Sequence, residues 1–201
     1  MKPFYGKEWL HNKLVDYLLK SDAEEARCLI LLGETATGKT HLASELKRPT
    51  VNASLTSLKQ LNQRMINAYF LNKRNKQKRS SYHLRRFCQH LSKALLDLAR
   101  LKTCKISEDN EPETDGECLS RSCVAFTREV LAPLKEQTAL TESYFILIDG
   151  FEDAECATTE MILSFLNRTF PHFPKWLHLV LTSNRCTEKK YVFRFSILKV
   201  K

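Results

Sequence analysis

The sequence lacks any apolar run that approaches the length of a membrane-spanning helix, and its first ten residues, MKPFYGKEWL, lack the apolar segment of a signal peptide. Its seven cysteines form no C-x-x-C pair and no cysteine–histidine cluster with zinc spacing. No segment repeats along the chain. These absences argue against a membrane protein, a disulfide-stabilised secreted domain, a zinc module and a solenoid. They predict a cytoplasmic protein with reduced thiols.

The chain has 201 residues, of which 43% are apolar, and this suffices for one α/β domain with a substantial core. Apolar runs predict strands at 28–32, 65–71, 144–149 and 176–181, and helical periodicity predicts helices over 7–20, 39–46, 81–101, 122–131 and from about 159. Strands that alternate with helices predict a mostly parallel sheet in a three-layer α/β/α arrangement. The tail, 186–201, is a candidate edge strand or a truncated end.

A phosphate-binding motif lies between the first strand and the helix that follows it. The segment LILLGETATGKTHLASEL contains G-x-x-x-x-G-K-[ST]. Gly33 and Gly38 permit bends at which a Cβ would clash, so that the amides between them can form an anion nest. Lys39 suits the β- and γ-phosphates, and the Thr40 hydroxyl suits Mg²⁺. The expected nucleotide-binding residues are Gly33, Glu34, Thr35, Ala36, Thr37, Gly38, Lys39, Thr40 and His41.

A second acidic motif follows on another strand. The segment YFILIDGFEDAE is an apolar run that ends in Asp149, at the carboxyl end of a buried strand, where open α/β sheets bind ligands. We expect Asp149 to hold Mg²⁺, directly or through a water molecule. Glu152 and Asp153 in the next loop either orient or activate the attacking water, or begin a solvated helix whose dipole favours carboxylates.

The third strand segment, WLHLVLTSNR, is apolar through Leu181 and then turns polar. Its last four residues, Thr182 to Arg185, have two interpretations. They sense the γ-phosphate from the carboxyl end of a strand, or they cap the strand and form a surface turn.

The net charge of +9 is unevenly distributed. Residues 73–86, KRNKQKRSSYHLRR, are basic without an acid, whereas SEDNEPETDGE is acidic and predicts a disordered surface loop over 105–120. The basic segment, Lys73 to Arg86, is a solvated loop and helix start, a contact for nucleic acid or anionic lipid, or a nuclear import signal by composition.

Together these motifs resemble the STAND class of signalling ATPases, relatives of the AAA+ proteins, and within it the NTPase module of TANC-type ankyrin-repeat scaffold proteins. FYGKEWL is similar to the entry motif F-x-G-R-E-x-x, GETATGKT to the phosphate loop, LIDGFEDAE to h-h-D-G-h-D-E-A, and FPKWLHLVLTSNR to F-P-x-W-L-x-L-h-h-T-S-R. The resemblance implies a P-loop NTPase fold, with Tyr5 and Gly6 beside the adenine and Arg185 as a γ-phosphate sensor.

The sequence departs from the class pattern at three places. Lys7 replaces the usual arginine, the acid pair is ordered Glu152–Asp153, and Asn184 is inserted before Arg185. The resemblance divides the chain into an adenine-side entry (1–27), an NTPase core (28–185) and a short tail (186–201). The winged-helix and ankyrin regions of the class are not in this chain, and a module without its lid is expected to hydrolyse ATP weakly.

Three functions are compatible with the sequence. The first is an ATP- and Mg²⁺-binding switch with weak hydrolysis, acting with protein partners in signalling or scaffolding. The second is a non-hydrolysing interaction module with an NTPase fold, and the third is an ATP-dependent nucleic-acid-binding protein that uses the basic segment. No N-K-x-D-like segment follows a strand, which favours ATP over GTP.

Overall fold

A computed structural model describes residues 8–20, 27–48, 56–71, 80–101, 114–136, 142–150, 156–184 and 196–200. Its strands are β1 (Cys28–Leu32), β2 (Met65–Phe70), β3 (Tyr144–Asp149), β4 (Leu177–Ser183) and β5 (Ser196–Lys199). They form one five-stranded sheet in the order β2-β3-β4-β1-β5, and every neighbouring pair is parallel. The prediction of an α/β fold with a parallel sheet is therefore confirmed. The strand expected in the tail is present as β5, while residues 186–195 lie outside the described residues.

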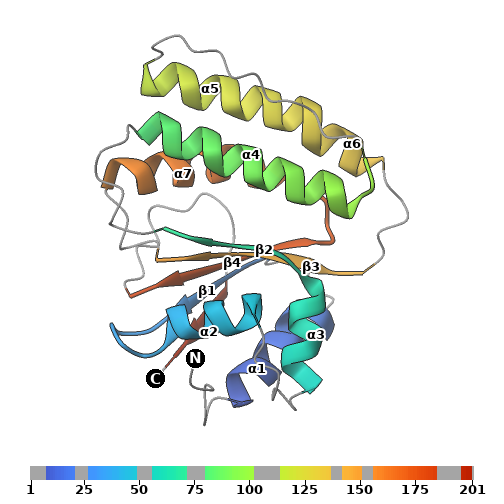
Figure 1. Cartoon of the computed structure of the whole chain (residues 1–201), viewed down its shortest axis with the longest axis vertical. Coiled ribbons are helices and arrows are strands. Elements are labelled where there is room, and N and C mark those ends of the chain that lie inside the picture. Colours follow the sequence, from blue (N-terminus) through green and yellow to red (C-terminus); the bar gives the residue numbers. More distant parts are fainter. Residues whose placement is uncertain are drawn as a thin grey trace.

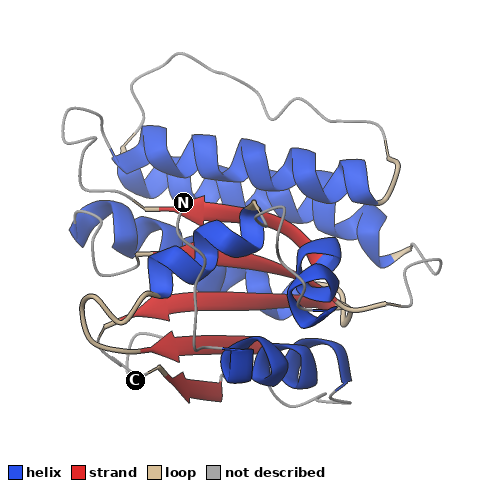
Figure 2. Cartoon of the chain, turned by 60° about the horizontal axis from the view of Figure 1, so that its bottom comes forward, coloured by secondary structure: helices blue, strands red, loops and turns tan. Residues whose placement is uncertain are grey.

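Helices cover both faces of the sheet (Figure 1). One face carries α1 (Glu8–Val15), its π-helical continuation η1 (Asp16–Lys20), α2 (Lys39–Lys47) and α3 (Thr56–Arg64). The other face carries α4 (Ser80–Leu98), α5 (Asp115–Phe126), η2 (Thr127–Leu131), α6 (Ala132–Lys135), α7 (Cys156–Thr169) and η3 (Phe170–His172). Figure 1 shows α5 lying over α4, farther from the sheet, and Figure 2 shows all strands pointing in one direction. No helix in the described ranges is both long and apolar enough to cross a membrane.

Successive residues of the strands pack into two separate cores. Ile30 of β1 belongs to the core beneath α4, α5 and α7, whereas its neighbours Leu29 and Leu31 belong to the core beneath α1, α2 and α3. Along a strand, adjacent side chains point to opposite faces, so a strand buried on both faces is mostly apolar along its whole length. All seven residues of β4 are buried, as expected for the central strand.

The helix expected from Ser122 begins earlier. Thr114 caps α5: its hydroxyl accepts a hydrogen bond from the backbone N–H of Glu117, and the Glu117 carboxylate accepts one from the backbone N–H of Thr114. This capping box, T-D-G-E, starts the helix at Asp115, so the prediction of a disordered loop extending to residue 120 is wrong for its last six residues. The rest of that predicted loop, 105–113, lies outside the described residues. The last predicted helix also starts earlier, at Cys156 instead of Thr159.

His178 on β4 is 5% exposed, and its Nδ1 has no hydrogen-bond partner among the described residues. Burial and the positive charge of Arg27 lower the pKa of His178 to about 4. In the unfolded chain His178 therefore takes up a proton near pH 6.5, whereas in the folded chain it stays neutral until the pH falls to about 4. The contribution of neutral His178 to stability is complete above the unfolded pKa and decreases as the pH falls toward 4.

We predict that lowering the pH from about 7.5 to about 5 costs the wild type about 2 kcal/mol more stability than it costs His178→Leu, which has no group to protonate at this position. Denaturant unfolding at the two pH values measures the difference. Equal losses in the two proteins would show that His178 is not the titrating group.

Candidate functional site

The loop between β1 and α2 folds into a closed turn. The Thr37 hydroxyl and backbone N–H both donate to the carbonyl oxygen of Glu34, at 2.9 and 3.3 Å. Ala36 and Gly38 adopt left-handed backbone conformations, with φ of 69° and 89°. Gly38 does so freely and caps α2, but Ala36 does so at a cost of about 1 kcal/mol. Backbone strain of this kind is typical of functional sites, where the strained conformation of the loop serves binding or catalysis.

Lys39 closes the base of this loop. Its ammonium group donates to the carbonyl oxygens of Gly33 at 2.6 Å and Glu34 at 2.8 Å, and only 7% of the residue is exposed. Within the described residues no carboxylate pairs with this ammonium. Neutral carbonyl groups thus hold a buried cation without neutralising it, and its charge remains available to an anion in the loop.

Gly33 is held between the two strands that flank β1. Its N–H donates to Ser183 on β4 at 3.1 Å, and the N–H of Val200, just past β5, donates to Leu32 at 2.6 Å. A Cβ at Gly33 would lie 2.5 Å from the Val200 carbonyl oxygen and 2.7 Å from Thr37 Oγ1. The first glycine of the loop is therefore required by the close approach of a neighbouring backbone, not by its φ angle.

Asp149 ends β3 and is 3% exposed. Its Oδ1 accepts a hydrogen bond of 2.6 Å from the Thr182 hydroxyl on β4, and the same hydroxyl accepts one of 3.0 Å from the N–H of Gly150. Because β4 lies between β1 and β3, Thr182 stands between the phosphate loop and Asp149. The interpretation of Thr182 as a mere strand cap is incomplete, since its side chain links the acidic motif to the site.

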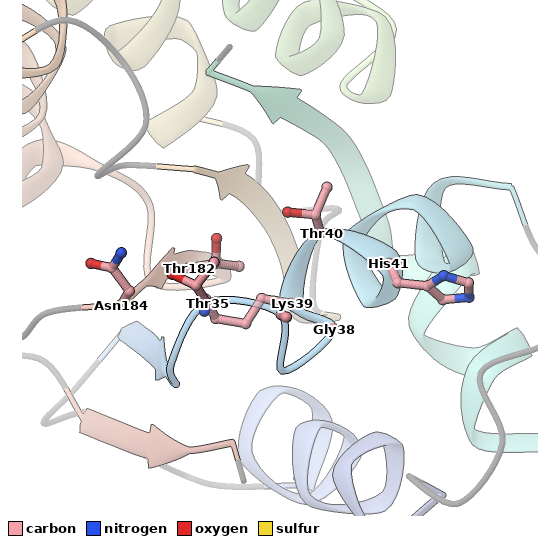
Figure 3. A pocket seen from close by; sticks show the side chains of 8 residues that line it. Thr35, Gly38, Lys39, Thr40, His41, Thr182 and Asn184 are labelled. Carbon is pink, nitrogen blue, oxygen red and sulfur yellow. The ribbon is translucent and has the colours of Figure 1, made fainter. Parts of the chain in front are cut away.

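These elements enclose a cavity of about 190 Å³ at the carboxyl end of the sheet (Figure 3). It is lined by Thr35, Ala36, Gly38, Lys39, Thr40, His41, Thr182 and Asn184. Figure 3 shows the Lys39 side chain extending back along the loop, while His41 points away from it. The volume is below the roughly 300–1,000 Å³ of pockets that enclose whole ligands, and it suits a chain of phosphates.

The residues present fit a phosphate chain with Mg²⁺. The Oδ1 atom of Asn184 is buried in the cavity wall without a hydrogen-bond partner among the described residues, which leaves an acceptor for Mg²⁺ or a water. Lys39 supplies a cation, and the start of α2 supplies backbone amides. No group of three or more His, Cys, Asp or Glu side chains in the described ranges forms a metal site.

The structure brings together most of the residues predicted for the site. Six loop residues from Thr35 to His41 line the cavity, whereas Gly33, Glu34 and Thr37 support it from behind. Asp149 reaches it through Thr182. Tyr5, Gly6, Glu152, Asp153 and Arg185 lie outside the described residues. Sequence analysis missed Val200, which has no motif to reveal it.

The family model described as Nephrocystin 3, N-terminal, matches residues 6–184 of the chain. The chain belongs to this family. The matched region of the nephrocystin 3 N-terminal family includes β1 to β4, the phosphate loop and the strand that carries Asp149. It thus contains every residue that lines the cavity, while Val200 and β5 lie beyond its end.

We predict that Gly33→Ala destabilises the domain by about 1–3 kcal/mol, because its Cβ would overlap the Val200 backbone and force the loop or β5 to move. Gly116→Ala is the matched control, since a Cβ there meets no atom of the described residues within 4 Å. Alanine on α5 should be neutral or stabilise by up to about 1 kcal/mol. Thermal unfolding compares the two variants, and equal effects would contradict the close approach at Gly33.

We predict that Thr182→Val destabilises the domain by about 1–3 kcal/mol, because it leaves the buried N–H of Gly150 and the carboxylate of Asp149 without their partner. Valine has nearly the shape of threonine, so packing changes little. Thr182→Ser keeps the hydroxyl and should retain most of the stability. Chemical unfolding of the two variants separates the hydrogen bonds from the methyl contact, and a Ser variant as unstable as the Val variant would argue against them.

Proposed function

We propose that this domain binds ATP with Mg²⁺ and acts as a nucleotide-dependent switch in a signalling or scaffold protein, with slow hydrolysis. The observation that carries the proposal is Lys39, a nearly buried cation that two loop carbonyls hold at the rim of a cavity sized for phosphates. The resemblance of four sequence motifs to STAND-class ATPases supports the choice of ATP and of a switching role.

Each residue has a definite task in this proposal. Lys39 exchanges at least one of its carbonyl contacts for phosphate oxygens and neutralises charge on them. The Thr40 hydroxyl and the Asp149 carboxylate hold Mg²⁺, with Thr182 fixing the orientation of that carboxylate. Bound Mg²⁺ would supply a Lewis acid that draws charge from the γ-phosphate. Glu152 or Asp153 would position the water for in-line attack, and their order, reversed from the class pattern, supports slow turnover.

The switching role is supported by the bond between Thr182 and Gly150. The Thr182 side chain, which lines the cavity, also holds the N–H of Gly150, whose φ is 78° and which precedes Glu152 and Asp153 in the sequence. A ligand that attracts the Thr182 hydroxyl weakens its bonds to Asp149 and Gly150. Occupancy of the cavity is thereby transmitted to the backbone after β3.

We predict that saturating Mg²⁺–ATP raises the melting temperature of the wild type by several degrees, since a ligand at about a hundred times its Kd adds roughly 2.7 kcal/mol. Lys39→Ala should lose this shift because its cation is gone. Lys59→Ala on α3 is the matched control, because Lys59 is exposed and is not among the residues that line the cavity.

Scanning calorimetry with and without nucleotide gives the shifts. A Lys39→Ala variant that keeps the full shift would contradict the proposed site. Multiple-turnover phosphate release that disappears in Asp149→Ala would establish hydrolysis, whereas binding without release would favour the interaction module with an NTPase fold.

A further inference from the structure

Cationic side chains form a line along the outer side of α4. Arg86, His90, Lys93 and Arg100 are all exposed, and they are separated by four, three and seven residues. The spacings of Arg86, His90 and Lys93 place these three on one side of α4, over about 10 Å of its length. Asp97 is the acid in this line. Arg100 stands just beyond the helix, in a left-handed conformation with φ of 54°.

Lys47 extends this line around the edge of the sheet. It belongs to α2, on the opposite face from α4, and β2 is the edge strand between these helices (Figure 1). Its Nζ donates to the Ala68 carbonyl oxygen on β2 at 3.1 Å and lies 5.4 Å from the ring centroid of Phe70. We call Lys47, Arg86, His90, Lys93 and Arg100 the basic belt.

Two observations show that positive charge accumulates at the belt. Burial and the charges of Arg86, Lys47 and Lys93 lower the pKa of His90, so three cations from two helices act on one imidazole. In the described part of the chain, none of Lys47, Arg86, Lys93 and Arg100 forms an ion pair with a carboxylate. Uncompensated like charge opposes folding, and a polyanion would relieve the repulsion.

The structure around the belt favours a nucleic acid over a lipid membrane as the polyanion that binds there. A helix that binds a membrane inserts an apolar face into lipid, but the apolar side of α4, with Leu84, Leu91 and Leu95, is fully buried against the domain. The belt consists of exposed cations that follow one another along α4 and reach Lys47 on α2, and such a row suits a row of backbone phosphates. The sequence pI of about 9.2 together with cations clustered along a helix is typical of nucleic-acid-binding domains.

We propose that the basic belt binds the phosphate backbone of a nucleic acid without reading its sequence. This inference does not depend on ATP binding, since the belt contains no residue that lines the cavity. Phosphate contacts release condensed counterions, so the affinity must fall steeply as salt rises. Residues 72–79, which precede α4, lie outside the described residues and form no part of the belt.

The test is fluorescence anisotropy of a labelled 30-nucleotide single strand and its duplex, titrated with the full chain over a range of salt concentrations. The belt variant is Arg86→Gln/Lys93→Gln/Arg100→Asn, in which asparagine tolerates the left-handed conformation. The matched control removes the same charge elsewhere, at three exposed residues: Lys59→Gln/Lys135→Gln/Arg168→Gln. Melting curves confirm that both variants fold, and Lys39→Ala serves as a cavity variant.

We expect the belt variant to bind at least tenfold more weakly at low salt, with the slope of log K against log salt reduced by about 2. The control and Lys39→Ala should bind like the wild type, even if the ATP proposal fails. Three results would overturn the proposal. The wild type could fail to bind either oligonucleotide, or the belt and control variants could lose affinity equally. The wild type could also bind vesicles of anionic lipid or polyglutamate more tightly than either oligonucleotide.

Discussion

The site depends on how the carboxyl end of β1 is held. Backbone hydrogen bonds from Gly33 to Ser183 and from Val200 to Leu32 fix it from both sides, and they bring a carbonyl oxygen where only glycine fits. From this anchored residue the loop turns through Ala36 and Gly38 into α2. Lys39 can then reach back to the carbonyl of Gly33. Without the anchor, the strained turn and the nearly buried cation would lack a rigid support.

The strand order determines how the two motifs communicate. Because β4 separates β1 from β3, the Asp149 carboxylate is not adjacent to the loop after β1, and the end of β4 lies between them. Thr182 of β4 lines the same cavity as the loop, and its hydroxyl donates to Asp149 and accepts from Gly150. A hydroxyl group has one proton and two lone pairs, so one acceptor position remains for a third group. A water molecule or another donor can therefore add to this hydroxyl without displacing either bond, whereas a phosphate oxygen must compete with Asp149 for its proton.

The strands and the tight turn between β1 and α2 were predictable from the sequence because their signals are local. Fully buried strands such as Cys28–Leu32 are continuous apolar runs, and the loop needs its glycines at fixed positions. The start of α5 was also local, in the T-D-G-E capping box, but the surrounding acidic residues concealed it. By contrast, the roles of Val200 and Thr182 arise from contacts across the sheet, and no spacing along the chain encodes which strand lies between two others. The belt likewise joins Lys47 to residues about forty positions later.

The two surfaces that we propose as anion-binding sites differ in the physics that they would use. In the cavity, a nearly buried ammonium and backbone groups act at short range in a medium of low polarity, where salt screens them little. Along the basic belt, exposed side chains act through water, where screening extends over about 10 Å at 0.1 M salt. A ligand in the cavity can be selected by shape, whereas a ligand on the belt is selected by charge density. Ionic strength should therefore separate the two activities: the belt releases its partner at salt concentrations that leave the cavity occupied.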